Sequence, residues 1–303
     1  MKTSAVTVDD LGRSVISVPP LARTADYELN AGANKQLLAH MRAGGVTTAL
    51  YGGNANLYNI SLGQYEQVIA GLVDWAATDT WVIPSIGPSF GQMLDHLDIV
   101  KQYDYPTVMV LPLRTPATPA GTAHGIRLAV ERYGKPIILY LKWEEYLSPQ
   151  LAAELVDDGL VCGIKYAIVR DDPAHDDYLH ELLGRVDPNL VISGIGERPA
   201  ITHWRDFGLR SFTSGTVCIG PRQASEILEH LKAERYSEAE VIRQRFLPFE
   251  DLRDSINPIR VLHEGVGATG VCEPGPLLPL LSGLEPLDSE RVATAARQLY
   301  ASE

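Results

Sequence analysis

The chain has 303 residues, of which 45% are hydrophobic and 21% charged, and its formal net charge is −12 at pH 7. This length suits one large α/β barrel with appendages or two ordinary domains, and the composition is that of a globular protein rather than a disordered one. The acidic balance argues against nucleic-acid partners and against a general affinity for anionic membranes.

The N-terminal residues 1–13 are polar and lack the apolar core of a signal peptide. No stretch of the sequence reaches the roughly 18 apolar residues that a membrane-spanning helix needs. Three cysteines, Cys162, Cys218 and Cys272, are widely separated and odd in number. We therefore expect reduced, buried thiols in a soluble cytoplasmic protein.

Eight short apolar runs alternate with longer segments in which apolar residues recur at helical spacing. The predicted strands are Ser14–Pro19, Thr47–Tyr51, Thr80–Ser85, Thr107–Pro112, Pro136–Tyr140, Val161–Lys165, Leu190–Ser193 and Ser211–Ser214. The predicted helices between them include Ser61–Ala77, Phe90–Tyr103, Ala120–Tyr133, Ser148–Asp158 and Asp172–Val186. Apolar strands joined by helices indicate parallel pairing that is covered on both faces.

The fold class expected from this alternation is a (β/α)8 TIM barrel over residues 1–235. A doubly wound sheet is the alternative, but Pro19-Pro20-Leu21 follows the first strand where a glycine-rich phosphate turn would stand. Three further helical patterns, near Ser237–Asp254, Pro258–Gly267 and Asp288–Ala301, form the rest of the chain. We expect residues 236–303 to be a C-terminal helical extension that packs on the barrel.

Lys165 is the residue that points most directly to chemistry, because it ends the apolar run Val161–Ile164. The carboxyl ends of barrel strands carry the active site, and burial there disfavours the ammonium form of a lysine. A free amine can attack a ketone and form a Schiff base. Tyr140 ends the preceding strand and could relay the protons of such a reaction. The alternative is a surface lysine whose stem covers the end of a strand.

Other strand ends supply glycines, whose amides can bind a carboxylate, among them Gly53 and Gly194. A metal site is not expected, because all eight histidines lie in predicted helical segments and no Cys-x-x-Cys pair is present. The acidic residues near Asp172 are explained by a helix N-terminus. No G-x-S-x-G element of a serine hydrolase occurs.

Gly163-Ile164-Lys165, with Tyr140 one strand earlier, resembles the Schiff-base lysine and tyrosine of the dihydrodipicolinate synthase/N-acetylneuraminate lyase superfamily. Gly52-Gly53-Asn54-Ala55-Asn56 stands in the place of that family's Gly-Thr-Thr-Gly-Glu loop. Leu190–Gly194 is similar to its seventh strand, and Asn257-Pro258-Ile259 to the segment before its penultimate helix. The resemblance extends over roughly residues 14–300.

The resemblance implies that Lys165 forms an imine with pyruvate or another 2-oxo acid, and that no cofactor is needed. The imine would act as an electron sink for carbon–carbon or carbon–oxygen bond cleavage. Tyr140 would relay protons, and the loop containing Gly53, Asn54 and Ala55 would hold the carboxylate, with Gly194 also in the site. The resemblance further implies a homo-oligomer, either a tetramer or a dimer.

Three departures from the family pattern bear on the substrate. The hydroxyl pair of the loop after the second strand is replaced by Gly53-Asn54 or Asn54-Ala55, and an amide cannot replace a hydroxyl in a proton relay. The family's tyrosine pair after the fourth strand reads Leu113-Arg114, and its arginine after the fifth strand is missing. Arg114 and Lys142 could instead pair with a carboxylate substrate, although loop charges at the surface explain them as well.

These observations favour a class I aldolase-type lyase, an aldolase or a dehydratase acting on a 2-oxo acid. Two alternatives stay open: a 4-hydroxy-tetrahydrodipicolinate synthase proper, and a 2-oxo-acid-binding relative with little turnover. A barrel enzyme without a Schiff base is less favoured, because both Lys165 and Tyr140 are retained.

Overall fold

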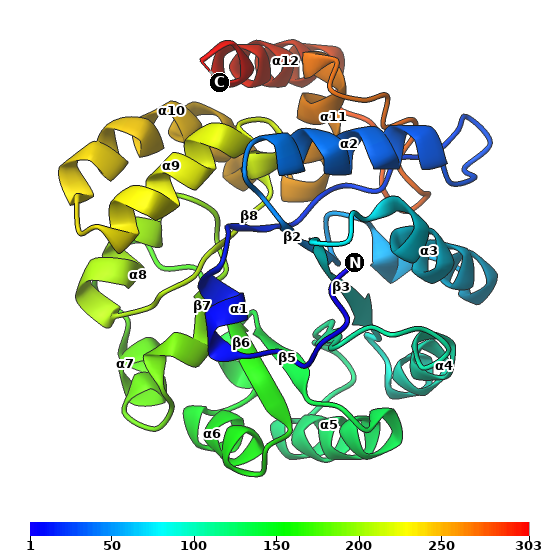
Figure 1. The fold of residues 1–303 in the computed structure, drawn as a ribbon, viewed down its shortest axis with the longest axis vertical. Coiled ribbons are helices and arrows are strands. Elements are labelled where there is room, and N and C mark those ends of the chain that lie inside the picture. Colours follow the sequence, from blue (N-terminus) through cyan, green and yellow to red (C-terminus); the bar gives the residue numbers. More distant parts are fainter. Residues whose placement is uncertain (303) are drawn as a thin grey trace.

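The computed structural model describes residues 1–302, and eight parallel strands form a ring at its centre (Figure 1). The strands are β1 (Ile16–Ser17), β2 (Thr48–Tyr51), β3 (Trp81–Ile86), β4 (Met109–Val110), β5 (Ile137–Leu141), β6 (Val161–Tyr166), β7 (Val191–Ser193) and β8 (Thr213–Ser214). Their order around the ring is β7-β6-β5-β4-β3-β2-β1-β8, and a parallel bridge between Ser193 and Phe212 closes it.

The predicted (β/α)8 barrel is confirmed, and each predicted strand overlaps an observed one. β1, β4 and β8 have two residues each and are shorter than predicted. Single hydrogen bonds continue the pairing beyond their ends, from Val18 N to Ser214 O and from Leu111 N to Ile86 O.

The helices are α1 (Val8–Gly12), α2 (Ala31–Ala43), α3 (Leu62–Trp75), α4 (Phe90–Val100), α5 (Pro119–Tyr133), α6 (Pro149–Asp157), α7 (Asp177–Leu183), α8 (Ala200–Phe207) and α9 (Pro221–Lys232), followed by α10 (Tyr236–Ser255), α11 (Pro258–Thr269) and α12 (Pro286–Ala301). Helices α2 to α9 surround the ring on its outer face, whereas α1 lies over one end of it (Figure 1). α6 begins as its sequence predicts, since the Ser148 side chain accepts a hydrogen bond from Leu151 N and Pro149 occupies the first turn.

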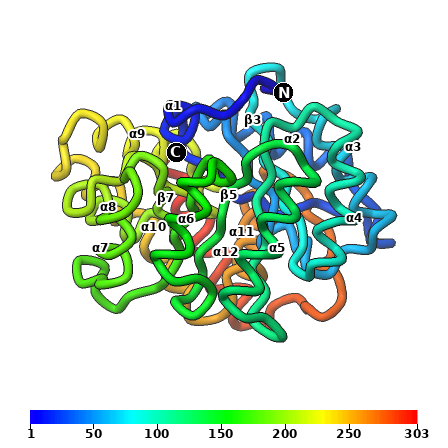
Figure 2. The backbone as a smooth tube through the Cα atoms, turned by 90° about the horizontal axis from the view of Figure 1, so that it is seen from below, coloured from blue at the N-terminus to red at the C-terminus, as the bar shows by residue number. Residues whose placement is uncertain are grey.

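One predicted helix start needs correction, and one helix lies in a segment for which none was predicted. α7 begins at Asp177 rather than at Asp172, because the Asp176 side chain caps it by accepting from Leu179 N. The polar N-terminal segment contains helix α1, which lies across one end of the barrel (Figure 2). Leu11 of α1 is fully buried and faces Gly163 of β6, where a Cβ atom would lie 3.3 Å from a Leu11 methyl group. Helix α1 therefore covers the amino-terminal end of the barrel and leaves the carboxyl ends of the strands uncovered by it.

The three predicted C-terminal helices are present as α10, α11 and α12, and they pack on one another beside α9 and α2 (Figure 1). α11 begins with Asn257, whose side chain accepts hydrogen bonds from Ile259 N and Arg260 N, and Pro258 occupies its first turn. The Asn-Pro-Ile segment is thus a helix start. None of the helices described in residues 1–302 combines the length and the apolar character needed to cross a bilayer.

Candidate active site

A cavity of about 220 Å³ opens where the strands end, between the barrel and helix α10. It is small, and charged, amide and phenol side chains lie in its wall among apolar ones. Its lining residues come from loops after six strands and from the C-terminal helices: Val18, Gly53, Asn54, Tyr58, Tyr140, Lys142, Lys165, Ala167, Val169, Gly194, Ile195, Gly196, Thr213, Gly215, Glu250, Arg253, Asp254, Pro258 and Ile259.

Lys165 lies inside the barrel near the end of β6. Side chains alternate along a strand, and Gly163 faces the barrel interior at Leu11, so Lys165 two residues later faces the interior as well. Its side chain is only 5% exposed, and it has no hydrogen-bond partner among residues 1–302. Burial, together with the positive charges of Lys142 and Arg253, lowers the pKa of Lys165 to about 7. This shift favours the free amine at neutral pH far more than in an exposed lysine.

Tyr140 pairs with Lys165 in register across β5 and β6, so both side chains project to the same side of the sheet. The Lys165 Nζ atom lies 4.4 Å from the centroid of the Tyr140 ring. Burial raises the pKa of Tyr140 to about 12, and the phenol is fully protonated at neutral pH. Lys142 follows β5 directly and continues the same face by the two-residue period. It lines the cavity rim, and burial lowers its pKa.

The loop after β2 contributes Gly53 and Asn54 to the cavity, whereas Ala55 is buried away from it. The Asn54 side chain donates a hydrogen bond from Nδ2 to Val18 O at 2.8 Å, which ties this loop to the end of β1. Gly194, after β7, also lines the cavity. The structure therefore brings six of the eight residues expected from the sequence to one cavity, with Ala55 and Arg114 outside it.

Helix α10 supplies residues that the sequence alone did not bring to the site. Arg253 on its last turn is half-buried and donates long hydrogen bonds to Thr216 Oγ1 at 3.4 Å and to Pro258 O at 3.5 Å. Gly215 makes this approach possible, because a Cβ atom there would lie 3.0 Å from the guanidinium and 2.8 Å from Asn54 Nδ2. The absence of a side chain at Gly215 lets two donor groups meet beside the cavity.

Two buried glutamates form part of the same wall. Glu250 of α10 accepts a hydrogen bond from Glu197 N at 3.0 Å, and Glu197 accepts one from Ser214 Oγ at 2.8 Å. Burial raises the pKa of both groups, and the charge of Glu250 raises that of Glu197 further. Glu197 Oε1 and Glu250 Oε2 are buried and have no hydrogen-bond partner in the described residues. Burial and mutual repulsion therefore favour a protonated carboxyl group in this pair.

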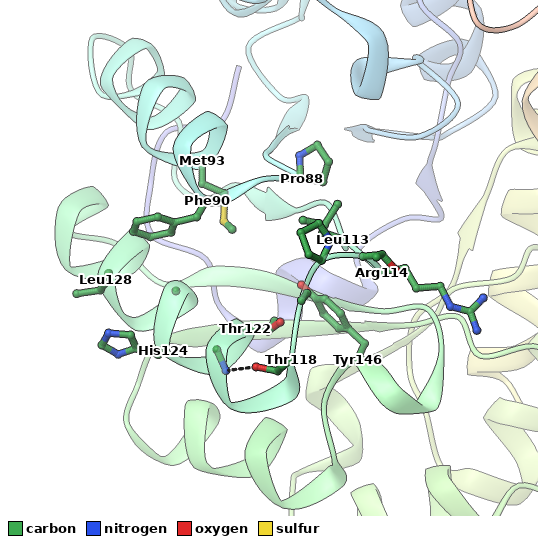
Figure 3. Close-up of a pocket in the computed structure, with 15 residues that line it drawn as sticks. Pro88, Phe90, Met93, Leu113, Arg114, Thr118, Thr122, His124, Leu128 and Tyr146 are labelled. Carbon is green, nitrogen blue, oxygen red and sulfur yellow. Dashed lines mark hydrogen bonds between the residues drawn. The ribbon is translucent and has the colours of Figure 1, made fainter.

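Arg114 lines a different cavity, a groove of about 640 Å³ between α4, α5 and the loop after β4 (Figure 3). The guanidinium points away from the groove, with its central carbon 5.7 Å from the centroid of the Trp143 ring. Apolar side chains such as Phe90, Met93 and Leu128 dominate the groove. The structure thus separates Arg114 from Lys142, which the sequence analysis paired on one substrate.

Sequence reasoning missed Arg253, Glu250, Glu197 and Tyr58, the last of which lines the cavity from the 3-10 turn Leu57–Asn59. Burial raises the pKa of Tyr58 well above its usual value. Arg253 and Glu250 lie three residues apart on one helical face and directly precede the Asn-Pro-Ile segment. That proximity to a family-like segment was the one available signal, because their distance in sequence from the barrel strands hides the contact.

No protein-family model matches the chain, and no curated protein matches it at a significant level. Solved structures do match it over almost its whole length. Dihydrodipicolinate synthase from Bacillus clausii is 22% identical, with a TM-score of 0.85 over 95% of this chain and 98% of that one. Sialic acid aldolase from Ruminococcus gnavus is 14% identical, with a TM-score of 0.83 over 96% of this chain and 98% of that one.

A third structure is a prophage protein of the dihydrodipicolinic acid synthase family from Escherichia coli, solved in complex with pyruvate. It is 17% identical, with a TM-score of 0.82 over 94% of this chain and 98% of that one. The fold is a (β/α)8 barrel with a C-terminal helical region. More particularly, it is the fold of these dihydrodipicolinate synthase and sialic acid aldolase structures.

Proposed function

We propose that the chain is a divergent member of the dihydrodipicolinate synthase/N-acetylneuraminate lyase superfamily. In this proposal it is a class I aldolase-type lyase that forms a Schiff base between Lys165 and pyruvate or another 2-oxo acid. The observation that carries the proposal is the buried amine of Lys165, which pairs in register with Tyr140 and lines a cavity together with Lys142 and Arg253. The fold shared with sialic acid aldolase and with a pyruvate-bound protein supports the same reaction class.

The chemistry begins with the free amine of Lys165. Its lone pair attacks the ketone carbon of the 2-oxo acid and forms a carbinolamine, which loses water to give a protonated imine. The positive imine nitrogen withdraws electrons from the adjacent carbon. This makes the neighbouring C–H bond acidic and the next C–C bond cleavable. Lys165 therefore serves both as nucleophile and, once condensed, as electron sink.

Tyr140 is assigned the proton transfers around this imine. Its phenol is protonated at neutral pH, because burial raises its pKa to about 12, so it can donate a proton to the departing hydroxyl of the carbinolamine. The resulting phenolate is stabilised by the positive charge of Arg253, which acts to lower the pKa of Tyr140. The same phenolate can take the proton back from a substrate carbon or hydroxyl.

The test is reductive trapping with pyruvate and sodium borohydride, followed by intact-mass measurement and peptide mapping. We expect one reduced adduct per chain, located on Lys165. The Lys142→Gln variant should still form the adduct, because Lys142 is not the nucleophile. An adduct on Lys142 in the parent protein, or no adduct with any 2-oxo acid of a broad panel, would overturn the proposal.

A further inference from the structure

The cavity contains two cationic side chains besides Lys165, in a protein whose overall charge is strongly negative. Lys142 comes from the end of β5, and Arg253 comes from the C-terminal helix α10. Neither makes an ion pair with a carboxylate within residues 1–302. A lysine at the rim of a cavity is common. The Arg253 guanidinium is more informative, because within the described part of the chain it makes only two long hydrogen bonds to neutral oxygens and therefore has N–H groups free to bind a ligand.

The acidic residues of the same wall are already engaged. Glu250 accepts the hydrogen bond from Glu197 N, and burial raises its pKa, which disfavours its charged form. Asp254 also lines the cavity and forms an ion pair with Arg198 at 3.3 Å. The carboxylates of the wall therefore do not neutralise both positive charges, those of Lys142 and Arg253. Both charges repel the ammonium form of Lys165 and contribute to its lowered pKa.

The two cations stand on opposite sides of Lys165. Lys142 follows β5, which neighbours β6 on one side. Arg253 lies against Gly215 after β8 and Asn54 after β2, which are on the far side of the ring from β5. A substrate bound covalently at Lys165 thus has one cation beside the loop after β2 and another at the opposite wall.

We infer that the substrate is a 2-oxo acid with a second carboxylate at its far end. Arg253 binds the carboxylate next to the imine carbon, and Lys142 binds the distal one. Arginine suits the first role because its planar fork matches both oxygens of a carboxylate. The volume of about 220 Å³ favours a short chain that ends in a carboxylate over one that ends in the bulkier phosphate. This inference rests on the proposed imine at Lys165.

The experiment compares two probes of equal length, 2-oxoglutarate and 2-oxohexanoate, which lacks the distal carboxylate, in borohydride trapping at Lys165. The half-saturating concentration of each is measured at about pH 9, where the Lys165 amine is free whichever neighbour is changed. For the parent protein, the half-saturating concentration of the diacid should be lower than that of the other probe by about tenfold or more. One hydrogen bond to a charged group supplies an advantage of this size. Lys142→Gln should bring the two values close to each other.

Arg253→Gln should raise the half-saturating concentrations of both probes by about ten- to hundredfold, since both carry the carboxylate next to the ketone. Two matched variants control for loss of charge. Lys135→Gln removes a lysine at the opposite end of β5, and Arg245→Gln removes an arginine of α10 that bonds Gln223 at 3.4 Å outside the cavity. Both should behave like the parent.

Equal half-saturation of the parent by the two probes would overturn the inference while leaving the imine at Lys165 intact. A preference for the diacid that survives Lys142→Gln would also overturn it, because the distal carboxylate would then be bound elsewhere. Absence of any adduct with pyruvate and with both probes would instead be the failure of the proposed function itself.

Discussion

Two hollows near the carboxyl ends of the strands differ in size and in the ionisable groups that line them. The groove between α4 and α5 has a volume of about 640 Å³ and a mostly apolar wall (Figure 3). His124 is an ionisable residue in that wall. The cavity at Lys165 has about 220 Å³, yet a lysine, a tyrosine and an arginine converge on it. Volume measures how much room a ligand has, whereas reactivity depends on buried ionisable groups whose environments change their pKa values.

The strongest test of which hollow is the active site is to remove one ionisable residue from each. Lys165→Ala should abolish trapping and lower turnover by at least about 10⁴-fold, because no other amine occupies its position. The melting temperature should not fall substantially, since the substitution also removes an amine whose burial is costly. His124→Ala should leave trapping at the parent level. Loss of trapping in the groove variant would contradict our placement of the site.

Tyr140→Phe separates chemistry from packing within the smaller cavity. The ring and its contact with Lys165 remain, and only the acid–base hydroxyl is lost. Turnover should fall by about 10²–10⁴-fold, with slower trapping, while stability changes by about 1 kcal/mol or less. Turnover and thermal unfolding are measured on the same preparation. A variant with lower stability and near-normal turnover would show that the tyrosine is structural.

The pH dependence of trapping tests whether the charged groups of the smaller cavity change the pKa of Lys165. The reactive form of Lys165 is the free amine, so the initial rate should rise with pH, reach half its maximum near pH 7 and level off above about pH 8. Lys142→Met removes a neighbouring positive charge, which makes the ammonium form less unfavourable. The midpoint should therefore move to higher pH. The profile is recorded at saturating pyruvate, and an unchanged midpoint would show that Lys142 does not influence the amine.

Arg114→Gln should have the smallest effect. Its guanidinium lies over Trp143 and points away from the groove, so its loss removes a cation–π contact of about 0.5–1 kcal/mol. Trapping at Lys165 should stay within about twofold of the parent, and its pH midpoint should not move. A large change in substrate affinity would mean that the loop after β4 reaches the substrate, as the sequence analysis considered.

Much of this arrangement follows from local sequence. Apolar strand runs separated by helical spacing indicate a parallel barrel, and in such a barrel Lys165 and Tyr140 must lie at neighbouring strand ends. Helix starts such as Ser148-Pro149 are equally local, because the capping hydrogen bond joins residues three apart. These features depend on interactions within a few residues or on the fixed two-residue period of a strand.

The tertiary structure alone decided the other half of the site. Arg253 and Glu250 reach the cavity from a helix that begins more than 60 residues after β6 ends, and no local pattern marks which face of that helix meets the barrel. Arg114 lies four residues after the end of β4, whereas Lys142 directly follows β5, and Arg114 lines the groove instead of the cavity at Lys165. Sequence periodicity determines which side of a strand a residue faces, whereas the approach of distant segments depends on how whole helices pack.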